Sequence, residues 1–100
     1  MRKIPQDAIN SRLISQLVAS AGSIGANYSE AGESESKKDF VHKILIAKKE
    51  IKESMHWIRI LATANENQKD GFRILWKEAH ELLLIFSKII SSSKKSKLDN

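Results

Sequence analysis

The sequence of 100 residues contains no cysteine, one proline and four glycines. Without cysteine it has neither disulfides nor thiolate metal ligands, an absence that fits a cytoplasmic protein. Because proline and glycine are scarce while Ala, Leu, Ile, Lys and Glu are abundant, the composition favours helices throughout. We therefore expect a single all-α domain with a modest core.

Long apolar runs are also missing. None approaches the roughly 18 residues that a membrane-spanning helix requires. The opening residues, MRKIPQDAINSR, lack the apolar middle region of a signal peptide. We expect a cytoplasmic protein with no membrane partner.

Positive charge exceeds negative charge, with 17 Lys and Arg against 12 Asp and Glu and a net charge of +5. On a small domain, a basic balance is typical of affinity for nucleic acid or for an acidic surface. It also serves ordinary solubility. Charge alone leaves both interpretations open.

Hydrophobic periodicity predicts a first helix that starts near Pro5 and ends at Gly32, a glycine that tolerates positive φ at a helix end. Its apolar face comprises Ile9, Leu13, Leu17, Ile24 and Tyr28. A second face carries small side chains that would let another helix come close, namely Ser15, Ala19, Gly22 and Ala26.

Ser36 and Asp39 form a capping-box pattern, S-x-x-D, ahead of an apolar-periodic run. This pattern predicts a second helix from about Lys37 to about Ala64, roughly 40 Å long. Its central stripe consists of Phe40, Ile44, Ala47, Ile51 and Ile58. Ile46, Trp57 and Leu61 widen the stripe on one flank, and so wide an apolar arc usually touches more than one helix.

A polar turn over residues 65–71 precedes a third helix. Its predicted core face comprises Phe72, Leu75, Trp76, Ala79, Leu82, Leu83, Phe86 and Ile90. Ile74, Ile85 and Ile89 lie on the adjoining flank, and Leu84 points nearly opposite the core. We expect residues 1–93 to form the bundle and residues 94–100 to form a basic, flexible tail.

Three stretches carry a family resemblance: SIGANYSEA, SKKDF and HKILIAKKEIKES. Over roughly Leu13 to Leu61, the chain resembles the small four-helix-bundle family encoded in intervening sequences of bacterial 23S ribosomal RNA genes. The accessory protein of diversity-generating retroelements is similar to that family. The residues at the family's spacings are Asn27, Glu30, Lys38, Asp39, Phe40 and Glu50.

The resemblance implies an antiparallel, up-down helical bundle that forms a homo-oligomer, and members of the family form five-fold barrels, which are pentamers. The family's first helix would precede Arg2, where this sequence has only Met1. We therefore expect three long helices, with the groove of the missing helix filled by a neighbouring subunit. The candidate contacts between subunits are Trp57, Ile74, Ile85 and Ile89.

Asn27, Glu30 and Glu50 recur as motif positions in the resembling family, and here they flank apolar faces. We interpret them, together with Lys43, as a polar network that fixes helix register, because a half-buried carboxylate needs a partner. Lys43 precedes Glu50 by seven residues on the same face and can bridge to a neighbouring helix. A recognition pocket is the alternative interpretation.

Glu53 and His56 have the E-x-x-H spacing of di-iron bundle proteins. A di-iron site needs a second such step, which the sequence lacks, and His56 lies nearly opposite the apolar stripe of its helix. No nucleophile and base are arranged for catalysis, and no glycine-rich phosphate loop follows a strand. We expect no metal, no cofactor and no enzymatic activity.

Basic side chains form the more informative pattern. Six of them fall within about 60° on either side of one line down the second helix: Lys38, His42, Lys49, Lys52, His56 and Arg59. Such a row can neutralise nucleic-acid phosphates in a salt-sensitive, largely sequence-independent way, although few exposed aromatic residues accompany it to stack bases. The third helix adds Arg73, Lys77, His80 and Lys88.

The sequence thus favours a non-catalytic, oligomeric helical scaffold. Through its basic surface it would bind RNA or DNA, or a nucleic-acid enzyme such as a reverse transcriptase. A protein–protein interaction adaptor without a nucleic-acid role is the main alternative. A metal-dependent bundle enzyme is a third hypothesis.

Overall fold

The computed structural model describes residues 5 and 7–98, with side chains up to residue 94. It contains the long helices α1 (Ala8–Gly32), α2 (Lys37–Ala64) and α3 (Lys69–Leu98). A short 3₁₀ helix, η1 (Glu66–Gln68), precedes α3. The described residues form no strand, so the predicted all-α architecture of three long antiparallel helices is confirmed.

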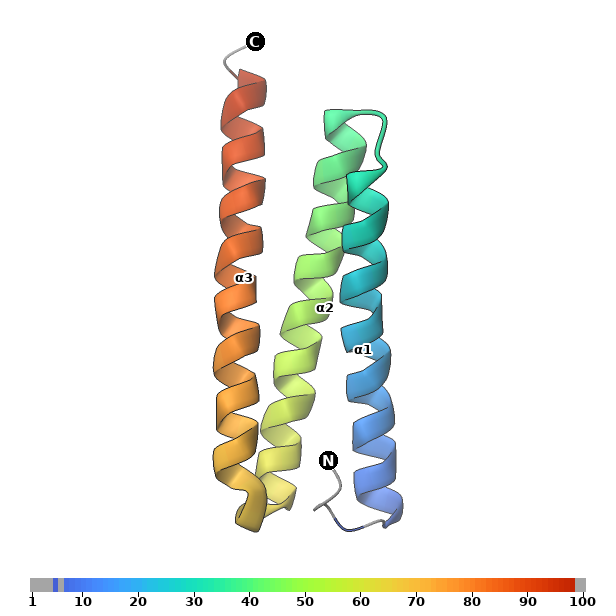
Figure 1. Cartoon of the computed structure of the whole chain (residues 1–100), viewed down its shortest axis with the longest axis vertical. Coiled ribbons are helices and arrows are strands. Elements are labelled where there is room, and N and C mark those ends of the chain that lie inside the picture. The colour runs from blue at the N-terminus through green and yellow to red at the C-terminus, as the bar shows by residue number, and fades with distance from the viewer. Residues whose placement is uncertain (1–4, 6, 99–100) are drawn as a thin grey trace.

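The middle helix of the molecule is α2, with α1 and α3 on either side of it (Figure 1). α1 and α3 run in the same direction, antiparallel to α2. Both pack along α2, whereas no Cα atom of α1 lies within 8 Å of a Cα atom of α3. Long side chains bridge these outer helices, because the rings of Tyr28 and Phe86 stack with their centroids 5.7 Å apart. The result is an elongated molecule with extents of 53 × 20 × 15 Å.

Side-chain caps set where the first two helices begin. Asp7 caps α1 by accepting a hydrogen bond from the backbone N–H of Asn10 at 2.8 Å. Pro5 therefore precedes the helix and does not stand in its first turn as expected. Ser36 caps α2 by accepting from the N–H of Asp39 at 3.1 Å, so α2 spans the predicted residues.

Gly32 ends α1 without the positive φ expected of it, since no described glycine has one. The C-cap is Glu33, with φ −101°, and its N–H donates to the carbonyl of Glu30 at 3.1 Å. A tight, right-handed last turn therefore closes α1. At the other end of the chain, α3 continues to Leu98, past the boundary expected at residue 93. The flexibility of residues 94–100 stays a prediction.

Two apolar clusters hold α2 against its neighbours. The cluster nearer the α1–α2 turn includes Ile44, Ile51 and Phe86, and the cluster nearer η1 includes Leu61 and Phe72. Ile44, Ile51 and Leu61 are fully buried, as their places in the predicted stripe of α2 imply. Burial of each such side chain contributes about 1.5–3 kcal/mol.

Buried polar side chains connect α1 to α2 in two places. The hydroxyls of Ser20 and Ser54 lie 3.0 Å apart, and the amides of Asn10 and Asn65 hydrogen-bond to each other. All four side chains are buried. The interface between α1 and α2 therefore contains a polar layer, formed by the two serines, and a polar end, formed by the two asparagines.

The apolar face predicted for α1 is only partly buried. Leu17 is buried, but Ile9 is 69% exposed and Tyr28 is 56% exposed. The face of small residues is exposed, and a Cβ added at Gly22 would meet no atom of another described helix within 4 Å. One side of α1 therefore stays open in the single chain.

Candidate nucleic-acid interface

The six basic residues predicted on α2 all lie on its exposed side. Ile44, Ile51 and Ile58 hold the opposite side of the helix in the core. From the first to the last of the six, the helix rises about 30 Å. The capped α2 thus presents a row of basic side chains: Lys38, His42, Lys49, Lys52, His56 and Arg59.

The row takes no part in the ion pairs of the described side chains. The ion pairs among the described side chains join Lys43 to Glu30 and Lys69 to Glu66. None of the six residues of the row takes part in an ion pair within the described part of the chain. Their charge is therefore available to an anionic partner.

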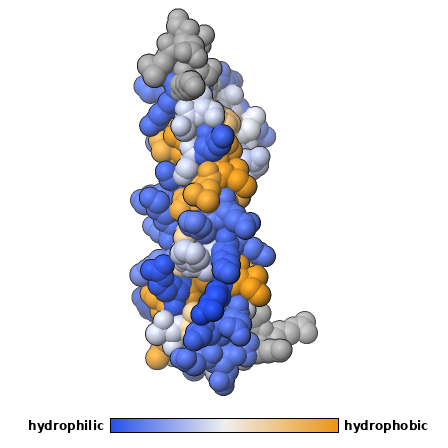
Figure 2. Space-filling view, turned by 90° about the vertical axis from the view of Figure 1, so that its left-hand side faces the viewer, coloured by the Kyte–Doolittle hydropathy of each residue, from blue (hydrophilic) through white to orange (hydrophobic). Residues whose placement is uncertain are grey.

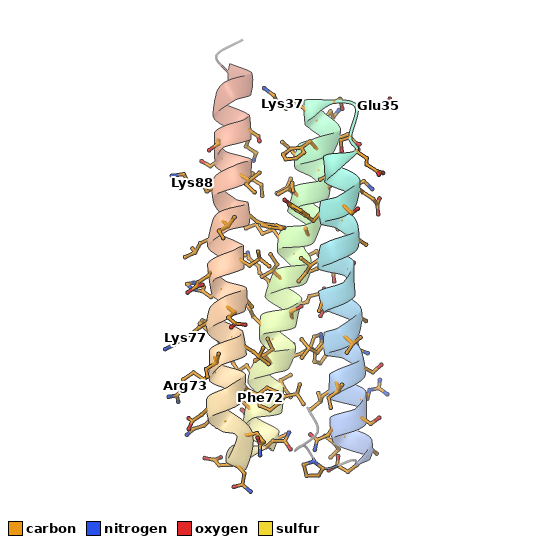
Figure 3. All side chains as sticks on the ribbon, viewed as in Figure 1. Glu35, Lys37, Phe72, Arg73, Lys77 and Lys88 are labelled. Carbon is orange, nitrogen blue, oxygen red and sulfur yellow. The ribbon has the colours of Figure 1, made fainter. Side chains whose placement is uncertain are left out.

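α3 carries exposed basic side chains of its own. Figure 3 shows Arg73, Lys77 and Lys88 projecting from α3 away from α2, whereas Phe72 points toward α2. We call the six cations of α2, together with those of α3, the basic face. Its members on α3 are Arg73, Lys77, His80 and Lys88.

Hollows in the groove between α2 and α3 bring the two sets of cations together. One hollow, of about 270 Å³, has Lys38 and His42 of α2 on one side and Lys94 of α3 on the other. A second, of about 300 Å³, is lined near η1 by Arg59 of α2 and by Lys69 and Arg73 of α3. The basic face is therefore a furrowed surface made by two helices.

Trp76 is the residue of this surface that the sequence interpretation missed. It belongs to the predicted core face of α3, but it is only half-buried and lies under Arg59, whose guanidinium carbon is 5.6 Å from the ring centroid. On its own helix it stacks with His80, at 5.2 Å between centroids and 10° between planes. The four-residue step from Trp76 to His80 was a signal for this stack.

The four residues of the predicted polar network make separate contacts, of which only one joins two helices. Lys43 and Glu30 form an ion pair of 2.8 Å between α2 and α1. The carboxylate hydrogen-bonds to the ammonium and attracts it, and so raises the pKa of Lys43 above its ordinary value. Asn27 donates to the carbonyl of Ser23 on its own helix at 2.9 Å. Glu50 accepts from Ser54 through its backbone carbonyl.

The four predicted subunit contacts occupy different surroundings. Trp57 is half-buried, packs against the cluster near η1, and has the ring of His56 at 5.0 Å. Ile89 is half-buried against the other cluster. Ile74 and Ile85 remain 59% and 55% exposed. Seen from the side of α3, exposed hydrophobic side chains gather in patches between hydrophilic ones (Figure 2).

The described residues offer no arrangement of metal ligands. No group of three or more His, Asp or Glu side chains among them is placed to hold a metal ion. Glu53 and His56, the candidate E-x-x-H pair, are both exposed. Likewise, no helix formed by these residues is long and apolar enough to cross a membrane.

Comparison with known proteins identifies a family. The model of a family described as 23S rRNA-intervening sequence protein matches residues 1–88. No similar chain was found among curated proteins or among solved structures. The match covers α1, α2 and most of α3, and so includes both helices of the basic face.

Proposed function

The chain belongs to the 23S rRNA-intervening sequence protein family, and we propose that it is a non-catalytic helical scaffold that binds RNA or DNA through the basic face. The exposed row on α2, free of ion pairs along about 30 Å, supports this proposal most strongly. The phosphates of a nucleic-acid strand are also charges spaced along a line, so several of them can meet the row at once. Each cation that neutralises a phosphate releases a condensed counterion, which drives association.

Three hydroxyl groups among the described residues support the non-catalytic part of the proposal. The hydroxyl of Ser54 lies 3.0 Å from the backbone carbonyl of Glu50, and Ser87 donates to the carbonyl of Leu83, four residues earlier in its own helix, at 2.8 Å. Thr63 does the same with the carbonyl of Arg59. A nucleophilic hydroxyl would instead need a hydrogen bond to a general base. The hydroxyls of these residues contact the backbone of their own helices.

Self-association is part of the same proposal. Val18 and Tyr28 of α1 and Ile85 of α3 are each more than half exposed. A large apolar surface seldom stays open on a soluble monomer. A ring of subunits, such as a pentamer, would cover this surface and would also repeat the basic face around the assembly. An enzyme acting on the bound RNA or DNA, such as a reverse transcriptase, is a further partner under this proposal.

Charge reversal tests the proposed binding. In the variant with Lys49→Glu, Lys52→Glu and Arg59→Glu, we expect the affinity for a labelled RNA or DNA strand in a gel shift to fall at least tenfold. Loss of even one charge-assisted phosphate contact costs about 1.4 kcal/mol, and each tenfold change in affinity corresponds to that energy.

A matched control separates position from net charge. Arg12→Glu on α1 changes the net charge as much as Arg59→Glu does, and Arg12 is also exposed. The proposal predicts a larger loss of affinity for Arg59→Glu than for Arg12→Glu. Equal binding by the wild type and the triple variant would favour a protein-interaction adaptor without a nucleic-acid role.

A further inference from the structure

The groove between α2 and α3 contains two adjoining hollows near η1. The larger, of about 300 Å³, is lined by Ile58 and Phe72 among others, and the smaller, of about 200 Å³, by Lys52 and His56 among others. Arg59 and Trp76 line both. This pair therefore forms the ridge between the hollows, and a ligand in either one touches it.

The larger hollow combines an apolar lining with a cationic edge. Ile58 and Phe72 belong to the apolar cluster nearer η1 and are buried, at 5% and 4% exposure. Arg59, Lys69 and Arg73 add positive charge to the same hollow. The Nζ atom of Lys69 lies 3.8 Å from a Glu66 carboxylate oxygen, and both side chains are largely exposed, so this pair restrains the lysine little. An apolar slot rimmed by cations suits a flat ring attached to a phosphate.

The ridge itself is a stack of planar groups. The guanidinium of Arg59, the indole of Trp76 and the imidazole of His80 follow one another at 5.6 and 5.2 Å. Planar cations and aromatic rings of this kind stack on nucleobases regardless of sequence. A base placed in either hollow meets one end or one edge of this stack.

The indole nitrogen of Trp76 adds a second observation. Its N–H is buried and has no hydrogen-bond acceptor among the described residues. A buried donor without a partner opposes folding, and such exceptions concentrate at sites with a role other than stability. A phenylalanine would fill the same wall of the groove without that cost.

We propose that the hollows beside Trp76 hold unpaired bases, so that the protein prefers single-stranded RNA or DNA to a duplex. This inference rests on the proposed function, because the phosphates of the strand would lie on the basic face. A duplex keeps its base faces stacked inside and offers only phosphates to the groove. A single strand can place a base against Trp76 while its neighbouring phosphates reach Arg59 and Arg73.

Tryptophan fluorescence tests the proposal without altering Trp76. In a Trp57→Phe variant, Trp76 is the sole tryptophan. This protein is titrated with a short oligothymidylate and with an abasic oligonucleotide of the same length, which has the same phosphates and no bases. We expect the oligothymidylate to quench Trp76 emission and the abasic strand to bind about tenfold more weakly, a difference that stacking of one base supplies.

A second single-tryptophan protein is the control. In Trp76→Phe, the reporter is Trp57, which packs against the apolar cluster nearer η1 and lines neither hollow. Its emission should change less than that of Trp76 when the strand binds, because only the ring of His56 connects it to the smaller hollow. The unmodified chain provides an independent measurement, because anisotropy of labelled base-containing, abasic and duplex probes requires no substitution.

The outcomes distinguish the two proposals. Equal affinity for base-containing and abasic strands, with unchanged Trp76 emission, would overturn the base-binding hollow and leave phosphate binding in place. Equal or tighter binding of a duplex would overturn the preference for single strands. Absence of binding to every probe would remove the proposed function and this inference together.

Discussion

The side chains of Asn10 and Asn65 hydrogen-bond to each other in both directions. The Nδ2 of Asn10 lies 3.1 Å from the Oδ1 of Asn65, and the Nδ2 of Asn65 lies 2.8 Å from the Oδ1 of Asn10. Both residues are buried, at 4% and 8% exposure. The pair joins the first turn of α1 to the C-cap of α2 across 55 positions of sequence.

Truncation of one asparagine should therefore lower the free energy of unfolding by more than the loss of its own hydrogen bonds. We expect Asn65→Ala to destabilise the fold by about 1–3 kcal/mol, because the Oδ1 of Asn10 is left buried without a donor, although its Nδ2 still reaches Pro5 and Asp7. Urea unfolding followed by circular dichroism measures the loss. Asn67→Ala, at an exposed position of η1, is the control and should leave the midpoint nearly unchanged.

For the Ser20–Ser54 pair, we expect replacement of both serines to cost no more stability than replacement of one. Each hydroxyl has one hydrogen, so one serine donates to its partner while the other donates to a carbonyl of its own helix. Replacing one serine by alanine removes the contact and should cost about 1 kcal/mol. Replacing both joins the two apolar clusters, and we expect the double variant to be at least as stable as either single one. A strictly additive loss in urea unfolding would contradict this view of the polar layer.

The ion pair between Lys43 and Glu30 should stabilise the fold in a pH-dependent way. Because the folded chain raises the pKa of Lys43, the contribution is complete below the ordinary value of 10.5 and disappears as the pH rises through the higher folded value. Both side chains are partly exposed, so the effect is small. Unfolding free energies of the wild type and Lys43→Met should differ slightly at neutral pH and converge in alkaline solution. A difference that stays constant up to strongly alkaline pH would exclude the pair as its cause.

Consecutive residues of α3 test the proposed assembly. Ile85 and Leu84 are similarly exposed, at 55% and 56%, but point about 100° apart around the helix. We expect Ile85→Glu to weaken self-association roughly a hundredfold, because a carboxylate would be buried without a partner. Leu84→Glu should have little effect. Sedimentation velocity measures both, and a wild-type chain that folds cooperatively as a monomer would contradict the assembly.

The periodic parts of the fold were predictable from the sequence. The capping pattern at Ser36 predicted the bounds of α2 correctly, and the apolar stripe predicted its buried apolar residues, except that Phe40 is only half-buried. Buried polar residues such as Asn10, Ser20 and Ser54 were not predicted, because a search for apolar periodicity passes over them. Pairing between α1 and α2 satisfies these groups, and the sequence of one helix does not reveal its neighbour.

The sequence failed to predict the exposure of α1 and the surroundings of Trp76 for another reason: both depend on how the helices pack together. Ile9 and Tyr28 lie at helical spacing with buried residues, but both stay more than half exposed, although the ring of Tyr28 stacks on Phe86. The spacing of Trp76 correctly placed it on the side of α3 that faces α2. It did not show that Arg59 would lie on the indole, because that contact depends on how α2 and α3 pack together.

The salt dependence of binding tests the central claim most directly. For a single strand, the logarithm of the association constant falls against the logarithm of salt concentration with a slope of about −0.7 per neutralised phosphate. We predict a steep slope for the wild type. With Lys49, Lys52 and Arg59 changed to glutamine, it should become shallower by about 2. An identical slope for both proteins would show that the basic face does not carry the contact with nucleic acid.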